Sequence, residues 1–135
     1  MILVDTNILL DLVTDDSQWF DWSVAAIESA AADGPVVINA VVYAELAARY
    51  ESPGQVDELI DATGVQYADI SRKAAFLAAK AFGRYRALGG TRSGVLSDFF
   101  IGAHASALDI PLLTRDTRRY LTYFPEVRLI APQMN

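Results

Sequence analysis

The chain has 135 residues, of which 53% are hydrophobic and 21% are charged. That length and balance predict one globular domain over residues 1–135 with its own core, and they exclude a disordered polypeptide. No apolar run is long enough to span a bilayer, and the N-terminal sequence MILVDTN reads as a strand rather than a signal peptide. The chain contains no Cys, which excludes disulfides and thiolate metal sites, and we expect a cytoplasmic protein.

The net charge of −6 is unevenly distributed along the chain. Residues 1–61 contain twelve acidic residues and one basic residue, a net charge of −11, whereas residues 62–135 contain five acidic and ten basic residues, a net charge of +5. The overall sign argues against a nucleic-acid-binding protein, but the asymmetry is consistent with an acidic metal pocket beside a basic face. The alternative is that most of these charges only solvate the surface.

Short apolar segments alternate with segments of helical periodicity along the chain. The apolar segments predicted as strands are Ile2–Val4, Val36–Ile38, Val65–Tyr67, Pro111–Leu113 and Val127–Ile130. The predicted helices are Ile8–Val13, Trp19–Ala32, Val41–Tyr50, Val56–Ala62, Arg72–Leu88, Asp98–Leu108 and Thr117–Tyr123. This alternation predicts an α/β fold with a mostly parallel sheet that is covered by helices on both faces.

Four acidic residues are expected at one edge of this sheet, because open α/β sheets form their sites at the carboxyl ends of the strands. Asp5 directly follows the first strand, and Glu45 lies in the helix after the second. Asp116 follows the fourth strand, and Asp98 opens the helix that leads to that strand. Each also has a structural explanation on its own. Asp5 would cap a helix, Glu45 would pair with Arg49, and the other two acids would favour helix N-termini.

A cluster of carboxylates is favourable only if a cation offsets the repulsion between like charges. Oxygen ligands suit hard cations such as Mg²⁺ or Mn²⁺. A zinc site is not expected, because the chain has no Cys and its one His, His104, lies about 240° around the helix axis from Asp98. Divalent ions support phosphodiester hydrolysis without a protein nucleophile, and neither a Ser-His-Asp arrangement nor a glycine-rich nucleotide loop is present.

The segments that carry these acids resemble the motifs of the PIN-domain family, and specifically of VapC-type ribonuclease toxins. They are VDTNILLDL with Asp5, VVYAELA with Glu45, SDFFIGAHA with Asp98 and PLLTRDTRRY with Asp116, and the resemblance covers essentially the whole chain. It implies a three-layer α/β/α sandwich with a central five-stranded parallel sheet. It also implies a Mg²⁺- or Mn²⁺-dependent endoribonuclease that cleaves single-stranded or looped RNA as the toxin of a type II toxin–antitoxin system.

The resemblance further implies roles and partners. Asp5, Asp98 and Asp116 are expected to bind the metal directly or through water, and Glu45 is expected to be a further ligand or the base for the attacking water. Toxins of this type are homodimers that are neutralised by a small cognate VapB-type antitoxin, and we expect both associations here.

Residues near the four acids receive secondary roles. Asn7 and Thr114 match positions of small polar residues, and we expect them to orient the surroundings of the metal. Phe99 stands where a smaller residue often follows the Asp, so we expect it to narrow the pocket. Asp11 is expected to be a partly exposed helix acid, and Asp109 a loop residue.

Arg92, Arg115 and Arg118 are the predicted contacts to RNA phosphates, because they lie close to the acidic motifs in the sequence. Two other readings stay open. A catalytically inactive PIN-like binding domain would scaffold RNA or a protein, although all four acids are intact. A signalling receiver domain fits less well, because it needs an acidic pair after the first strand where this chain has Asp5 followed by Thr6.

Overall fold

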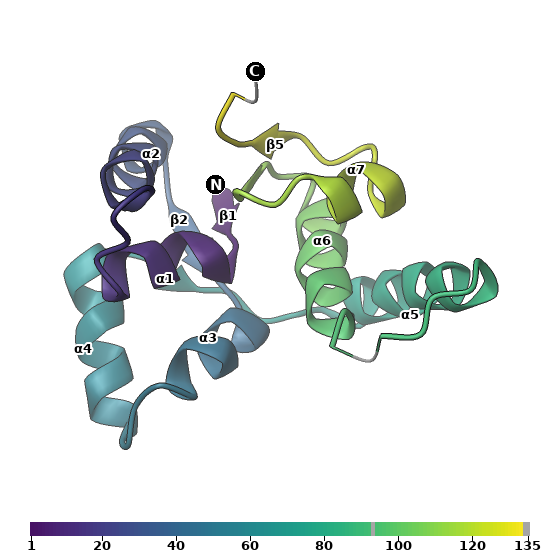
Figure 1. Cartoon of the computed structure of the whole chain (residues 1–135), viewed down its shortest axis with the longest axis horizontal. Helices are drawn as coiled ribbons and strands as arrows, with labels where there is room; N and C mark the ends of the chain where they lie inside the picture. Colours follow the sequence, from purple (N-terminus) through teal and green to yellow (C-terminus); the bar gives the residue numbers. More distant parts are fainter. Residues whose placement is uncertain (93, 134–135) are drawn as a thin grey trace.

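In the computed structural model, which describes residues 1–92 and 94–133, five parallel strands form one sheet and seven helices pack against it (Figure 1). The strands are β1 (Ile2–Val4), β2 (Val36–Ile38), β3 (Gln66–Tyr67), β4 (Leu112–Leu113) and β5 (Leu129–Ile130). The helices are α1 (Thr6–Val13), α2 (Phe20–Asp33), α3 (Ala40–Ala47), α4 (Pro53–Thr63), α5 (Arg72–Ala87), α6 (Leu96–Leu108) and α7 (Arg118–Tyr123). The predicted α/β/α fold with a five-stranded parallel sheet is confirmed. Across these described residues, no helix is long and apolar enough to cross a membrane.

Side-chain caps explain why α1 and α4 begin earlier than predicted. The Asp5 side chain accepts a hydrogen bond from the backbone N–H of Thr6, so α1 begins there rather than at Ile8. The Ser52 side chain accepts from the backbone N–H of Gln55, whose side chain accepts from the Ser52 backbone in return. This capping box starts α4 one turn before the first residue of its predicted apolar periodicity.

The strand order β3-β2-β1-β4-β5 places β1 at the centre of the all-parallel sheet. The chain adds β2 and β3 on one side of β1 and then β4 and β5 on the other, so the strand order reverses between β1 and β4. Right-handed crossovers put α1–α4 on one face and α5–α7 on the other, and Figure 1 shows these two groups on opposite sides of β1. In open α/β sheets, ligands bind at the carboxyl ends of the strands where the order reverses. The fold therefore predicts a ligand site in the crevice beyond the carboxyl ends of β1 and β4.

The central strands form the hydrophobic core. Every residue of β1, β2 and β4 is buried, which accounts for their uniformly apolar sequences. The edge strands differ, because β3 is exposed and β5 is half-buried. Helix α6 packs closely on this core, and a Cβ atom at Gly102 would overlap the ring of Phe124. The packing between α6 and the segment before β5 therefore leaves no room for a larger residue at Gly102.

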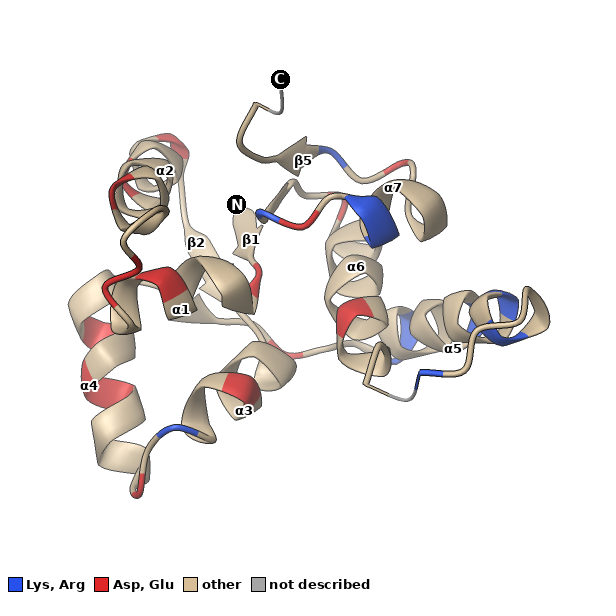
Figure 2. Ribbon diagram, viewed as in Figure 1, with Lys and Arg blue, Asp and Glu red and all other residues tan. Residues whose placement is uncertain are grey.

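The charge asymmetry of the sequence becomes a division in space. Figure 2 shows acidic residues spread over α1–α4, whereas basic residues gather on α5 and at the start of α7. Helices α3 and α6, one from each group, are in contact. This arrangement agrees with the expectation of an acidic pocket beside a basic face.

Candidate active site

Four carboxylates line one open hollow of about 440 Å³ at the crevice. Asp5 caps α1 directly after β1, and Glu45 lies in α3. Asp98 is in the first turn of α6, and Asp116 lies between β4 and α7. The structure therefore brings together all four acids that the sequence motifs singled out. We call this hollow, with Asp5, Glu45, Asp98 and Asp116, the acidic pocket.

Asp5 is the most enclosed of these acids, with 4% of its surface exposed. Its Oδ1 accepts a hydrogen bond of 2.7 Å from the backbone N–H of Thr6. Its Oδ2 accepts from the hydroxyl groups of Thr114 and Tyr120, both at 2.8 Å, and from the Asn7 amide at 3.3 Å. Donors from α1, the end of β4 and α7 therefore fix this carboxylate in one orientation.

Burial raises the pKa of Asp5 from 3.8 to about 6. The hydrogen bonds from Thr114, Tyr120 and Thr6 oppose this effect, and the charge of Asp98 adds to it. Burial and the Asp5 charge raise the pKa of Tyr120 well above its usual value, so its hydroxyl group stays a donor. An ionised Asp5 is thus costly in the absence of a cation, even with all its donors.

Asp98 has an internal counter-ion. The Nη1 atom of Arg119, near the start of α7, donates to its Oδ2, and both side chains are partly exposed. Burial raises the pKa of Asp98, the Arg119 guanidinium lowers it, and the charge of Asp116 raises it further. Arg119 therefore neutralises part of the negative charge that the fold gathers in the acidic pocket.

Glu45 is exposed, and its Oε1 accepts a hydrogen bond of 2.7 Å from the Thr6 hydroxyl group. Its helix is held by Asn39, whose Oδ1 accepts from two backbone N–H groups in the first turn of α3. The Asn39 amide lies 3.1 Å from Nδ1 of His104 in α6. Both residues are buried, and burial lowers the pKa of His104. As predicted, His104 is outside the acidic pocket, and it joins the two helices that carry Glu45 and Asp98.

Thr114 and Asn7, expected to orient the metal's surroundings, form one hydrogen-bonded unit. Thr114 donates to Asp5, and its Oγ1 accepts from the backbone N–H of Asp116 at 3.0 Å. The Asn7 amide donates to Thr114 Oγ1 at 3.3 Å, and its Oδ1 accepts from the backbone N–H of Arg115 at 3.1 Å. These contacts tie the loop after β4 to the start of α1 and position Asp116 relative to Asp5.

The donor chemistry of the acidic pocket fits a hard divalent cation, because carboxylate oxygens and small polar side chains line it. In the present arrangement, no three acidic or His side chains within residues 1–92 and 94–133 lie close enough to hold a metal ion. Arg119 engages Asp98, while Glu45 and Asp116 extend into solvent. A cation would therefore have to displace Arg119 and draw the exposed acids inward.

The prediction for Asp11 is wrong, and Arg115 makes a contact with it that the sequence did not predict. Asp11 is 2% exposed rather than partly exposed, and Arg115 binds it through Nε at 2.7 Å and Nη2 at 2.8 Å. Ser23 of α2 donates to the same carboxylate at 2.6 Å, and the Arg115 guanidinium lies over the Trp19 ring. Arg115, which stays a predicted RNA contact, anchors the loop after β4 to α1 and α2.

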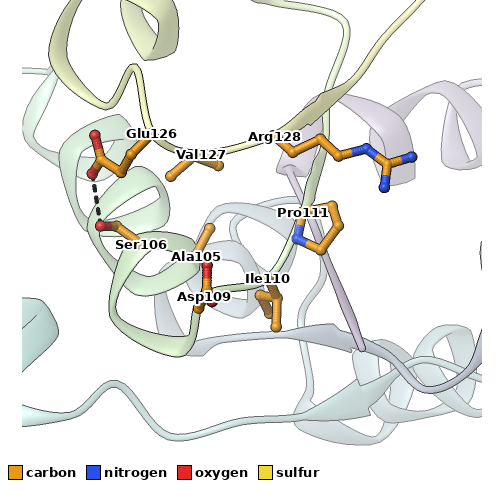
Figure 3. A pocket seen from close by; sticks show the side chains of 8 residues that line it. All are labelled: Ala105, Ser106, Asp109, Ile110, Pro111, Glu126, Val127 and Arg128. Atoms are coloured by element: carbon orange, nitrogen blue, oxygen red, sulfur yellow. Dashed lines mark hydrogen bonds between the residues drawn. The ribbon is translucent and has the colours of Figure 1, made fainter.

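Phe99 does not narrow the acidic pocket as expected. It is fully buried, packs edge-to-face against Tyr123 and Phe82, and is not among the residues that line the acidic pocket. Asp109 ends α6 in a left-handed conformation with φ 54°, as the predicted loop residue. It lines a separate hollow of about 210 Å³ that Figure 3 shows beside the Ser106–Glu126 hydrogen bond. This hollow lies at the amino ends of β4 and β5, whereas the four acids lie beyond the carboxyl ends of the strands.

Arg92 and Arg118, the other predicted RNA contacts, lie together in a third hollow of about 450 Å³. Asp116 lines both this hollow and the acidic pocket. Arg119 and Tyr123 lie in its wall as well. The two pockets are therefore neighbours, and the basic side chains predicted for RNA binding stand beside the predicted catalytic acids.

Sequence reasoning did not identify Tyr120 or the pairing of Arg119 with Asp98. Tyr120 is 1% exposed and donates to the most buried acid of the site. A usable signal was its place at the end of the PLLTRDTRRY segment, because a Tyr that packs against a sheet needs a hydrogen-bond partner for its hydroxyl group. No local pattern indicates which of three neighbouring Arg residues reaches Asp98.

Comparisons with known proteins agree with this fold. The family model of the PIN domain matches residues 2–125. The fold is similar to VapBC2 from Rickettsia felis bound to a DNA fragment from its promoter, with a TM-score of 0.73, 21% identity and coverage of 97% of this chain and 98% of that chain. It is also similar to VapBC-1 from nontypeable Haemophilus influenzae (0.71, 18%, 97% and 98%) and to a toxin–antitoxin complex from Klebsiella pneumoniae (0.70, 22%, 100% and 100%). No curated protein sequence matches the chain.

The raised pKa of Asp5 predicts the pH dependence of stability in the metal-free protein. The native state binds this proton more tightly than the unfolded chain, so the free energy of unfolding increases as pH falls from about 6 towards 3.8. Between pH 7 and pH 5 we expect Asp5 to contribute a gain of about 1 kcal/mol in EDTA. Urea unfolding of the wild type and of Asp5→Asn at both pH values measures this gain as the difference between the two proteins, because the lowered pKa of His104 acts in the opposite direction in both. Equal changes in stability of the two proteins between pH 7 and pH 5 would contradict this account.

Arg115→Ala separates an anchoring role from RNA contact. The substitution leaves the Asp11 carboxylate buried without its counter-ion, so we expect a loss of about 3 kcal/mol in the free energy of unfolding. Arg128→Ala, at an exposed position before β5, is the control and should change stability by less than about 0.5 kcal/mol. Chemical denaturation measures both variants. Unchanged stability of Arg115→Ala would contradict the anchoring role, and weaker RNA binding at unchanged stability would support the predicted RNA contact.

Proposed function

Because the chain belongs to the PIN domain family, we propose that it is a Mg²⁺- or Mn²⁺-dependent endoribonuclease that hydrolyses RNA phosphodiester bonds in the acidic pocket. One observation carries the proposal, namely that four carboxylates from separate elements line one open hollow at the topological switch of the sheet. Such a concentration of acids is costly unless a cation binds. Burial is the main cause of the raised pKa of Asp5, and the charge of Asp98 adds to it.

Each side chain in the pocket has a defined part in this proposal. Asp5, Asp98 and Asp116 would hold the ion, which supplies the Lewis-acid chemistry that phosphodiester hydrolysis needs. Thr114 and Tyr120 keep the Asp5 carboxylate oriented towards that position. Glu45, which is exposed and accepts a hydrogen bond from Thr6, would be a further ligand of the ion or the base that accepts a proton from the attacking water.

We also propose that the chain is the toxin of a toxin–antitoxin pair and forms a homodimer. The similar structures from Haemophilus influenzae and Klebsiella pneumoniae are of VapBC-1 and of a toxin–antitoxin complex, and the likeness extends over nearly all of each chain. Phe76 and Leu88 of the α5 region, at 61% and 78% exposure, offer apolar surface for association. A small antitoxin that covers the acidic pocket would block the entry of RNA.

A second candidate is a PIN-like domain that binds RNA without cleaving it. The pairing of Arg119 with Asp98 and the wide spacing of the acids in the present arrangement favour this alternative. The presence of all four acids in one pocket favours cleavage. Metal-dependent cleavage assays decide between the two.

Glu45→Gln tests the proposed activity, because an exposed residue is replaced by one of the same shape. With purified protein, Mg²⁺ or Mn²⁺ and structured RNA, we expect defined cleavage that EDTA abolishes. Glu45→Gln should lower its rate by about 100-fold or more. The control is Glu58→Gln, an exposed acid on α4 outside the pocket, which should cleave like the wild type. Equal rates for the two variants would contradict the role of Glu45. RNA binding without cleavage under any metal would favour the alternative function.

Arg119→Met tests whether Arg119 competes with the cation for Asp98. Removal of a positive charge from the pocket should increase the affinity for Mn²⁺ by about three- to tenfold. Isothermal titration calorimetry measures this binding without RNA, and Arg128→Met at the opposite sheet edge is the control. Weaker Mn²⁺ binding by Arg119→Met alone would show that Arg119 supports the site rather than competing for it.

A further inference from the structure

The third hollow has a composition that the proposed cleavage reaction does not by itself explain. We call it the basic pocket. Its volume of about 450 Å³ is within the range of small-ligand sites. It opens beside the acidic pocket, with which it shares Asp116. The residues that line it are Tyr85, Arg92, Asp116, Arg118, Arg119, Thr122 and Tyr123.

The basic pocket contains guanidinium groups that are not neutralised. Arg92 and Arg118 are exposed, and neither takes part in the two ion pairs found within residues 1–92 and 94–133. Arg119, in contrast, is engaged by Asp98. The two guanidinium groups attract an anion to the basic pocket, whereas the four carboxylates repel it from the acidic pocket. A phosphate group is therefore attracted to the basic pocket next to the acids.

Arg92 is held in place by the aromatic wall of the basic pocket. Its backbone N–H donates to the hydroxyl group of Tyr85 at 3.1 Å. Gly90 packs so closely on Tyr85 that a Cβ atom would overlap the ring. The segment that carries Arg92 is thus anchored on α5, which fixes the backbone position from which the Arg92 side chain extends.

Tyr123 provides a rigid aromatic surface in the same pocket. Its ring packs edge-to-face on the buried Phe99 at a centroid distance of 5.1 Å and on Tyr85 at 6.2 Å. The side chain is only half-buried, so part of the ring remains at the surface. Unstacked nucleobases bind to such surfaces, and nearby guanidinium groups bind the attached phosphates.

We propose that the basic pocket binds the nucleotide next to the scissile phosphate, with its unstacked base against Tyr123 and its phosphate against Arg92 and Arg118. This inference rests on the proposed function and specifies which part of the RNA the chain grips. It requires a single-stranded nucleotide, because a base within a duplex is stacked between its neighbours and does not reach the ring. An acidic peptide would satisfy the arginines but would leave the aromatic surface unused.

Fluorescence anisotropy with a labelled single-stranded octaribonucleotide in EDTA tests the proposal without cleavage. We expect Tyr123→Leu to weaken binding by about tenfold, and Tyr123→Phe, which keeps the ring, to stay within about twofold of the wild type. Arg118→Ala should weaken binding by about fivefold, and the control Arg128→Ala should not weaken it. Thermal unfolding confirms that each variant is folded, and the exposed Arg118 keeps the test valid if Tyr123→Leu is unstable.

A second arm asks whether the ring and a base interact. Oligonucleotides with one abasic position are compared on the wild type and on Tyr123→Leu. The loss of affinity at one position should occur in the wild type and vanish in the variant. Wild-type affinity of both Tyr123→Leu and Arg118→Ala would overturn the proposal. So would a hexaglutamate peptide that binds more tightly than RNA and depends on the same side chains. Because binding is measured in EDTA, a failure of metal-dependent cleavage in the separate assay leaves this result intact.

Discussion

The buried carboxylate of Asp5 is the constraint on which the rest of the crevice depends. It ends the central strand, caps α1 through Thr6, and accepts hydrogen bonds from Thr114 after β4 and from Tyr120 in α7. One side chain therefore connects the two strands at the topological switch with a helix on each face of the sheet. The cost of burying it is only partly offset, because its pKa is still about 6. Groups with strongly shifted pKa values cluster at functional sites, which agrees with the proposal that Asp5 binds a cation.

Two further polar networks connect the elements that surround the acidic pocket. Arg115 joins the loop after β4 to Asp11 in α1, and Asn39 joins the start of α3 to His104 in α6. Both networks connect elements that carry side chains of the acidic pocket. Buried hydrogen-bonded groups fix relative positions more strictly than apolar packing does, because an unmade bond in the interior is expensive. The polar residues of the interior are thus placed where the geometry of the site requires precision.

Local rules predicted the positions of the four acids but not their partners. Short apolar strands and turn residues locate strand ends within a few residues, and strand ends locate Asp5 and Asp116. The pairing of Arg115 with Asp11 spans 104 positions in the chain and depends on how α1 docks beside the loop after β4. Phe99 follows an acid of the pocket but faces an aromatic cluster, because helix rotation is set by packing against α5. Contacts of this kind follow from tertiary structure and have no signature in the sequence.

The Arg119 guanidinium links the two pockets, because it pairs with an acid of one and lines the other. It now binds Asp98, and it also lines the hollow that contains Arg92 and Arg118. If a cation takes over Asp98, the freed guanidinium adds a third positive charge beside the place proposed for an RNA phosphate. The cation would then strengthen phosphate binding. By linkage, a phosphate that holds Arg119 away from Asp98 would strengthen cation binding by the same factor. The acidic and basic pockets would therefore act as one site, in which metal and RNA each favour the arrangement that the other requires.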